Sequence, residues 1–220
     1  MEEHYGDYLK TVRELSSNGK KSLVEDDCRQ YAFDDLSEQV FPTGKKPTSE
    51  DGLAVLKKEI LLTEFKTGFR DKISVINQDL LKCCDDEAKT CREYGKLLIR
   101  KRTLEKKELL DSIKMKAVES YLTLEKKFFP KCDEIIQGEN LKTVRGYKIK
   151  YCVVIDDYVD SMEDTLAEMA HHPVETNSIT MVRNALNRFV GLRADDEDYL
   201  YDEIKVVTPW NFLSARRCYG

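Results

Sequence analysis

The sequence lacks any apolar run near the roughly 18 residues that a membrane-spanning helix needs. Its first residues, Met1 to His4, are too acidic and polar to open a signal peptide. Internal repeats and low-complexity segments are missing too, which excludes collagen-like and repeat architectures. Of 220 residues, 41% are apolar and 35% are charged, enough apolar material for one core or two small ones. We therefore expect a soluble globular protein without a membrane span.

Short catalytic motifs are missing as well. The sequence contains no G-x-G-x-x-G, G-x-x-x-x-G-K-[ST], H-E-x-x-H or G-x-S-x-G pattern. Such patterns place phosphate-binding amides, metal ligands or a nucleophilic serine at fixed spacing, so a nucleotide-binding or hydrolase function has no motif to support it. We expect a protein that is not an enzyme and that uses no cofactor.

The seven cysteines form an odd set without regular spacing. Cys83, Cys84 and Cys91 make the only cluster, whereas structural metal sites usually combine two pairs at C-x-x-C spacing. We expect buried free thiols, no metal, and a reducing compartment: the cytoplasm or nucleus, including cytosolic sites of viral assembly.

Charge is unevenly distributed along the chain. The net charge is -5, yet residues 96–131 carry 11 Lys and Arg against 5 Asp and Glu. A basic segment of this kind is typical either of a nucleic-acid-binding face or of a solvated helix with acids interleaved at ion-pair spacing. The candidate contacts to nucleic acid are Arg100, Lys101, Arg102, Lys106 and Lys107.

Apolar residues recur with a period of 3.6 in two stripes, over 62–98 and over 110–128, which is the period of an amphipathic helix packed on neighbours. Thr48 to Asp51 resembles the N-terminal cap of the first helix. The two stripes are out of phase, so we expect a bend or interruption near 100–103. Pro130 should end the helical region.

The flanking segments carry weaker patterns. We expect a short helix within residues 1–17, a loop at 42–47, strands at 147–155 and 204–207, and helices at 161–172 and 177–191. A short first arm at 141–144 could pair with the first strand as a hairpin. The predicted fold is mainly α: long amphipathic helices packed as a bundle or hairpin, with a small α+β C-terminal region. Its three parts are an N-terminal helix and loop segment (1–47), a long helical region (48–138) and the small α+β region (139–220).

Three further patterns are candidate sites. Glu168 and His171 have the spacing of a di-iron helix motif, but one copy cannot complete that site. Asp156 and Asp157 follow a strand, where carboxylates hold metals or complement a helix dipole. Tyr201 lies in an acidic stretch that resembles a tyrosine-phosphorylation site. We assign no catalytic, cofactor-binding or metal-binding residue, and the helix-terminal roles are the simpler interpretation of the acids and histidines.

Two long helical stripes without catalytic motifs favour a structural or interaction subunit of a larger protein assembly, with other protein subunits as partners. A minor component of a virus particle fits the small size and the reduced cysteines. The alternatives are a nucleic-acid-associated protein that uses 96–131 and a helical metalloenzyme around Glu168 and His171.

Overall fold

The computed structural model describes residues 8–41, 47–56, 58–82, 92–131, 147–156, 178–189 and 200–214. Within them, six strands form one mixed sheet in the order β1-β2-β3-β4-β5-β6. The pairs β1–β2, β2–β3 and β3–β4 are antiparallel, whereas β4–β5 and β5–β6 are parallel. The strands are β1 (Leu9–Thr11), β2 (Arg29–Ala32), β3 (Gly52–Leu56), β4 (Glu59–Lys66), β5 (Lys148–Ile155) and β6 (Glu203–Val207).

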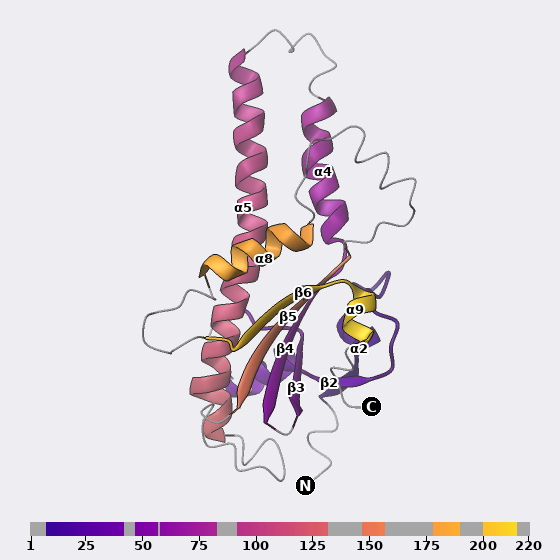
Figure 1. Ribbon diagram of the computed structural model, residues 1–220, viewed down its shortest axis with the longest axis vertical. Helices are drawn as coiled ribbons and strands as arrows, with labels where there is room; N and C mark the ends of the chain where they lie inside the picture. Colours follow the sequence, from indigo (N-terminus) through magenta and orange to yellow (C-terminus); the bar gives the residue numbers. More distant parts are fainter. Residues whose placement is uncertain are drawn as a thin grey trace.

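Helices cover both faces of the sheet (Figure 1). One face packs against α3 (Phe33–Val40), α8 (Ser178–Phe189) and the C-terminal half of α5 (Arg92–Thr123), which continues into a π-helical turn, η2 (Leu124–Phe128), and a 3-10 turn, η3 (Phe129–Lys131). The other face packs against α2 (Val12–Leu15) and α9 (Pro209–Ser214). The N-terminal half of α5 and the neighbouring α4 (Phe69–Lys82) project beyond the sheet (Figure 1).

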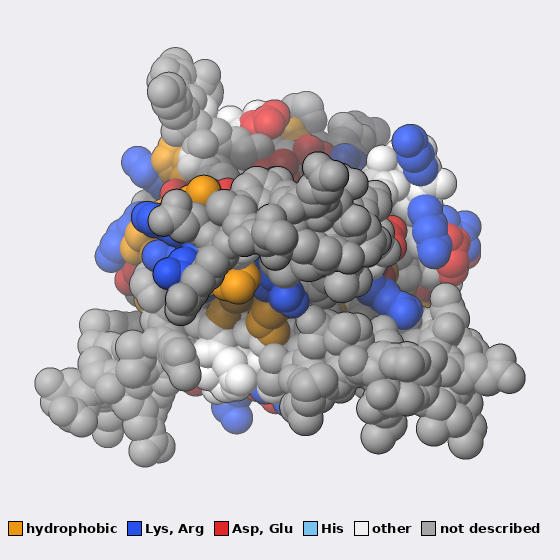
Figure 2. Space-filling model, turned by 90° about the horizontal axis from the view of Figure 1, so that it is seen from above, with side chains coloured by type: hydrophobic (Ala, Val, Ile, Leu, Met, Phe, Trp, Pro, Cys, Tyr) orange, Lys and Arg blue, Asp and Glu red, His pale blue; other side chains and the backbone are white. Residues whose placement is uncertain are grey.

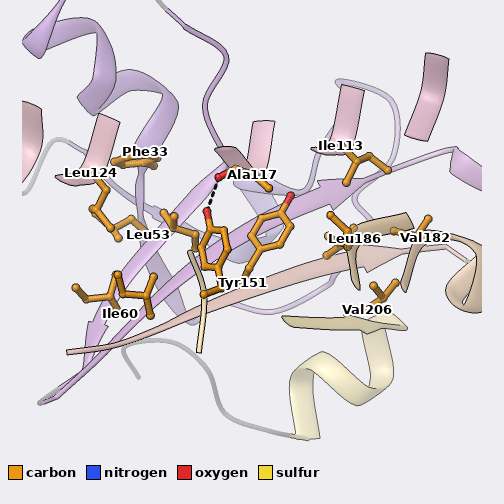
Figure 3. Packing of buried hydrophobic residues seen from close by; sticks show 14 of the residues in the cluster. Phe33, Leu53, Ile60, Ile113, Ala117, Leu124, Tyr151, Val182, Leu186 and Val206 are labelled. Carbon is orange, nitrogen blue, oxygen red and sulfur yellow. Dashed lines mark hydrogen bonds between the residues drawn. The ribbon is translucent and has the colours of Figure 1, made fainter. Parts of the chain in front are cut away.

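The larger core joins the sheet to α5 (Figure 3). Tyr151 on β5 stacks on Tyr201, with ring centroids 5.1 Å apart, and the Tyr201 hydroxyl donates a hydrogen bond of 2.6 Å to the carbonyl oxygen of Ala117 in α5. Phe33 of α3 meets Phe128 of η2 edge to face. These contacts fix the C-terminal half of α5 against the sheet.

The mainly helical prediction is wrong, because a six-stranded mixed sheet is the centre of the fold and α5 is the one long helix among the described residues. The first helical stripe included Leu62 and Phe65, which lie in β4. All six residues from Ile60 to Phe65 are buried. A strand covered on both faces loses the alternation of apolar and polar residues, so its apolar run resembles a helix segment.

The helix cap predicted just before this region is wrong as well, because the helix that it would open is a strand. Thr48 to Asp51 caps no helix and instead leads into β3. The short helix expected within residues 1–17 is present as α2, four residues long, with a capping box formed by Thr11 and Glu14. The expected bend near 100–103 is absent, because α5 runs unbroken from Arg92 to Thr123. The sequence there contains no Gly or Pro to interrupt it.

Other predictions are confirmed. The alternating segment at 147–155 forms β5, the segment at 177–191 contains α8, and 204–207 lies in the edge strand β6. Pro130 itself lies in the 3-10 turn η3, after the α-helical part of this region has ended at Thr123. The predicted helix at 161–172 and the hairpin arm at 141–144 lie outside the described residues. The parts of the chain that can be described contain no helix both long and apolar enough to cross a membrane.

Candidate functional site

Acidic and basic side chains meet where β3 begins and β4 ends. The ladder places Gly52 opposite Thr63, so Asp51, just before β3, lies beside the last residues of β4. The Asp51 amide donates to the Thr63 carbonyl (3.1 Å), and the Phe65 amide donates to Asp51 Oδ2 (2.7 Å). Glu64 and Lys66 are two residues apart on β4, so their side chains share one face of the sheet.

Helix α5 adds a second cation to this group. Lys116 Nζ lies 3.0 and 2.9 Å from the two carboxylate oxygens of Glu64, and 3.6 Å from Asp51 Oδ1. Lys66 Nζ forms an ion pair with Glu64 Oε1. Two carboxylates from adjacent strands thus bind the same ammonium group, and a second ammonium flanks one of them. We call Glu50, Asp51, Glu64, Lys66 and Lys116 the charged cluster.

Backbone contacts hold α5 in register with the segment before β3. The Thr48 amide donates to Glu119 Oε2 (2.6 Å), and the Glu50 amide donates to Ser120 Oγ (2.9 Å). Since Lys116 lies one helical turn before Ser120, these contacts also fix the point from which its side chain extends.

Glu50 is the deepest member of the cluster. It is fully buried, and neither carboxyl oxygen has a hydrogen-bond partner among the described residues. Burial, followed by the neighbouring charge of Glu64, raises the pKa of Glu50 well above its usual value. Burial beside another carboxylate therefore favours the protonated, neutral form of Glu50.

The other carboxyl groups titrate differently. Burial and then the Glu64 charge raise the pKa of Asp51 to about 7. Burial also opposes ionisation of Glu64, but a contact with Glu50 and the ammonium groups of Lys66 and Lys116 lower the pKa of Glu64 overall. Although burial favours the neutral amine, the surrounding carboxylates raise the pKa of Lys116 above its usual value. As the pH rises through 7, Asp51 ionises and adds a second negative charge beside Glu64.

One side of the cluster reaches solvent. The Glu64 side chain is 1% exposed, whereas Lys66, Lys116 and Asp51 are 19%, 23% and 26% exposed. A ligand could therefore approach Asp51 and the two lysines without unfolding the sheet, and would meet Glu64 behind them.

The carboxylates of the charged cluster suit a hard cation that takes its remaining ligands from water or from a substrate. Among the described residues, no three His, Cys, Asp or Glu side chains are grouped so that they could hold a metal ion by themselves. Mg²⁺, however, is commonly bound by one or two carboxylates together with waters and substrate phosphates. Asp51 and Glu64 fit that pattern, and the ammonium of Lys116 already occupies a cation position between them.

The basic residues predicted from the sequence lie away from the charged cluster. Arg100, Lys101, Arg102, Lys106 and Lys107 are all on the projecting half of α5. Lys101 pairs with Glu105 at 3.6 Å, one turn along the helix. Viewed toward the projecting end, Lys and Arg side chains are exposed at the surface with apolar side chains beside them (Figure 2).

The remaining candidates have local roles or lie outside the described residues. Asp156 accepts the amides of Gly68 (2.6 Å) and Arg70 (2.9 Å), and so caps the start of α4. Tyr201, the candidate phosphorylation site, is 3% exposed and bonded to α5. Residues 83–91, Asp157, Glu168 and His171 are not described.

The cysteines divide in a way that spacing did not reveal. Cys152 is a buried free thiol, as expected. Cys28 is disulfide-bonded, so the expectation of free thiols is wrong at that position. Sequence spacing does not show which cysteines are neighbours in space.

Sequence reasoning missed Asp51, Glu64, Lys66 and Lys116. Asp51 was assigned to a helix cap, and the apolar neighbours of Glu64 to a helical stripe. The available signal was the pair Glu64 and Lys66, two charged residues at alternate positions at the end of an apolar run.

Comparisons with known proteins add no assignment: no protein-family model matches the chain, and no curated protein or solved structure is significantly similar to it.

Proposed function

We propose that this chain hydrolyses phosphodiester bonds of nucleic acids with the help of a divalent cation. The observation that carries the proposal is the pair of carboxylates, Asp51 and Glu64, that converges on one cation position with Lys66 beside it. Asp51 and Glu64 would hold Mg²⁺ or Mn²⁺. The metal would lower the pKa of a bound water and stabilise negative charge on the phosphate.

Lys66 supplies a positively charged hydrogen-bond donor, which the two carboxylates cannot provide. Its ammonium lies against Glu64 at the partly exposed side of the cluster, where it can donate hydrogen bonds to the attacking water or to a phosphate oxygen. In the reaction, the oxygen of water bonds to phosphorus, and the bond from phosphorus to the leaving oxygen breaks. The water gives up a proton and the leaving oxygen gains one, so the products are a phosphomonoester and a free hydroxyl.

The basic half of α5 supports a polynucleotide rather than a small phosphodiester. Arg100 lies 16 positions before Lys116 in the same unbroken helix, which corresponds to about 24 Å at a rise of about 1.5 Å per residue. A mononucleotide cannot reach both regions. A strand of several nucleotides can, and phosphate contacts from Lys and Arg are independent of sequence. This proposal takes up the predicted alternative of a nucleic-acid-associated protein.

The test combines metal binding with cleavage. Mn²⁺ titration calorimetry on the purified chain should give one site, and Mg²⁺ or Mn²⁺ should support cleavage of labelled single-stranded DNA, duplex DNA or RNA. Glu64→Gln should abolish Mn²⁺ binding and lower cleavage by at least about 100-fold. Lys66→Met should keep Mn²⁺ binding and lose cleavage.

Glu59→Gln is the matched control. Glu59 is on the same strand and pairs with Lys150 at 2.7 Å, at the far end of β4 from the cluster. Its replacement should change neither Mn²⁺ affinity nor cleavage. If wild type binds no Mn²⁺, or if Glu59→Gln and Glu64→Gln behave alike, the charged cluster is a structural ion-pair network and the proposal is wrong.

A second candidate function is the assembly subunit predicted from the sequence. The projecting half of α5 exposes three large apolar side chains, Leu97 (62%), Ile99 (58%) and Leu104 (49%). Exposed apolar side chains gathered on one element favour a protein partner. Light scattering in low and high salt checks this: a mass above that of one chain that is insensitive to salt supports an assembly, and a monomer argues against self-association.

A further inference from the structure

We infer that Lys116 is an internal counter-ion, which the divalent cation displaces from Asp51 and Glu64 and which then contacts the substrate phosphate. The inference rests on the proposed function and adds a role for a residue on α5. It starts from the position of one ammonium group, 2.9 Å from Glu64 and 3.6 Å from Asp51.

The first argument is exclusion. The carboxylate oxygens that Lys116 binds are those that would ligate the metal, and Mg²⁺ needs its oxygens at about 2.0–2.1 Å. A dication at that distance and an ammonium in its present position would occupy the same space with charge of the same sign. Metal entry therefore requires Lys116 to leave Glu64.

The second argument is charge balance. Without metal, the carboxylates of Asp51 and Glu64 are paired with the ammonium groups of Lys66 and Lys116. A divalent cation adds two positive charges to this balanced group. A phosphodiester brings a negative charge to the same place, so the released ammonium gains a new partner when the substrate binds.

The third argument concerns where Lys116 can go. Its side chain is 23% exposed, next to the partly exposed Asp51 (26%), and its backbone is fixed by the contacts of the next turn to Thr48 and Glu50. The side chain can therefore turn toward solvent while α5 stays in place.

The test is the Mn²⁺ affinity of Lys116→Met. Removing the competing ammonium should tighten Mn²⁺ binding at least tenfold, while kcat/KM for the nucleic-acid substrate should fall at least tenfold because the phosphate contact is lost. A residue that only stabilised the fold would weaken metal binding or leave it unchanged. Lys116→Arg retains the competing charge and should bind Mn²⁺ no more tightly than wild type.

Lys114→Met is the matched control. Lys114 is two residues away on α5, and its ammonium forms an ion pair with Asp111 at 2.5 Å. Lys114→Met removes the same charge from the same helix but no contact with the charged cluster. Its Mn²⁺ affinity should therefore stay within twofold of wild type. An equal gain in both variants would reduce the effect to net charge and overturn the inference.

A measurement on the wild-type chain covers the case in which Lys116→Met fails to fold. Acetylation of lysines, followed by mass spectrometry of peptides, should show Lys116 reacting severalfold faster with Mn²⁺ than without it, and Lys114 unchanged. Unchanged or slower acetylation of Lys116 would overturn the inference.

The two proposals fail in distinguishable ways. If wild type, Lys116→Met and Glu64→Gln all bind no Mn²⁺, the proposed function itself is wrong. If wild type binds Mn²⁺ and Glu64→Gln does not, but Lys116→Met gains no affinity, only the role of Lys116 is wrong.

Discussion

The two halves of α5 are parts of one helix with opposite environments. In the C-terminal half, Ile113, Ala117 and Ser120 are buried against the sheet, and Lys116 reaches the charged cluster. In the N-terminal half, Leu97 and Ile99 are exposed, and so are Arg100, Lys101 and Lys107. The helix is continuous because the segment that joins its two halves contains no Gly or Pro to interrupt it. Only the packed half is positioned well enough to carry a site, whereas the projecting half offers a surface.

The largest expected effect comes from placing a charge in each half. Ile113→Asp buries an unpaired carboxylate and should destabilise the fold by several kcal/mol, enough to leave the chain largely unfolded. Leu104→Asp, at a site 49% exposed, should change the free energy of unfolding by less than about 0.5 kcal/mol. Urea unfolding followed by circular dichroism measures both. Equal losses would mean that the projecting half is packed as tightly as the other.

A smaller effect separates the buried and the exposed side of the C-terminal half of α5, through two serines. Ser120→Ala removes the acceptor of the buried Glu50 amide and should cost about 1–3 kcal/mol. Ser112→Ala, on the same helix, removes only an exposed contact to the Leu109 carbonyl and should cost less than about 0.5 kcal/mol. A neutral Ser120→Ala in the same unfolding assay would show that Ser120 does not fix the register of α5.

The pH dependence of stability tests the contact that Tyr201 makes between the sheet and α5. Burial raises the pKa of Tyr201 well above 10, so its contribution to stability is complete below about pH 10 and is lost as the pH rises further, where the unfolded chain ionises first. Tyr201→Phe should cost about 1 kcal/mol at pH 7, for the bond to Ala117. Its stability should then fall less steeply than that of wild type above pH 10. Parallel alkaline unfolding curves would contradict this assignment.

The smallest effect concerns the projecting half as a nucleic-acid surface. Lys107→Gln should reduce the slope of log K against log salt by roughly 0.7–0.9, without changing Mn²⁺ affinity. Lys126→Gln, in η2 below the packed half, should leave the slope unchanged. Fluorescence anisotropy with a labelled oligonucleotide measures both. Equal slopes for wild type and Lys107→Gln would show that Lys107 does not contact the nucleic acid.

The sequence was informative wherever one face of an element stays polar. Alternating residues identified β5, a polar-faced stripe identified α8, and the stripe at 110–128 contained Ile113, Ala117, Leu124 and Phe128, all of which are buried. It misled at β4, because both faces of that strand are covered. The charged cluster was hidden for a different reason: Asp51 and Glu64 become neighbours only through the pairing of β3 with β4.

The pairing of Lys116 with the cluster depends equally on tertiary structure. Lys116 is 52 residues from Glu64, and no spacing rule links a lysine in one helix to a carboxylate in a distant strand. Its helical neighbours Glu119 and Ser120 look like ordinary surface residues in the sequence, yet both bond the segment before β3.

The strand order of the sheet follows the order of the chain, and this has a consequence for synthesis. As the ribosome releases the chain from its N-terminus, β1 to β4 can pair one after another, each with a strand already made. The site residues, from Asp51 to Lys116, emerge before β5. Until Lys148–Ile155 follow, β4 has one edge with unpaired backbone amides and carbonyls. The nascent chain is therefore most exposed to wrong pairing during the interval in which α4 and α5 are being translated.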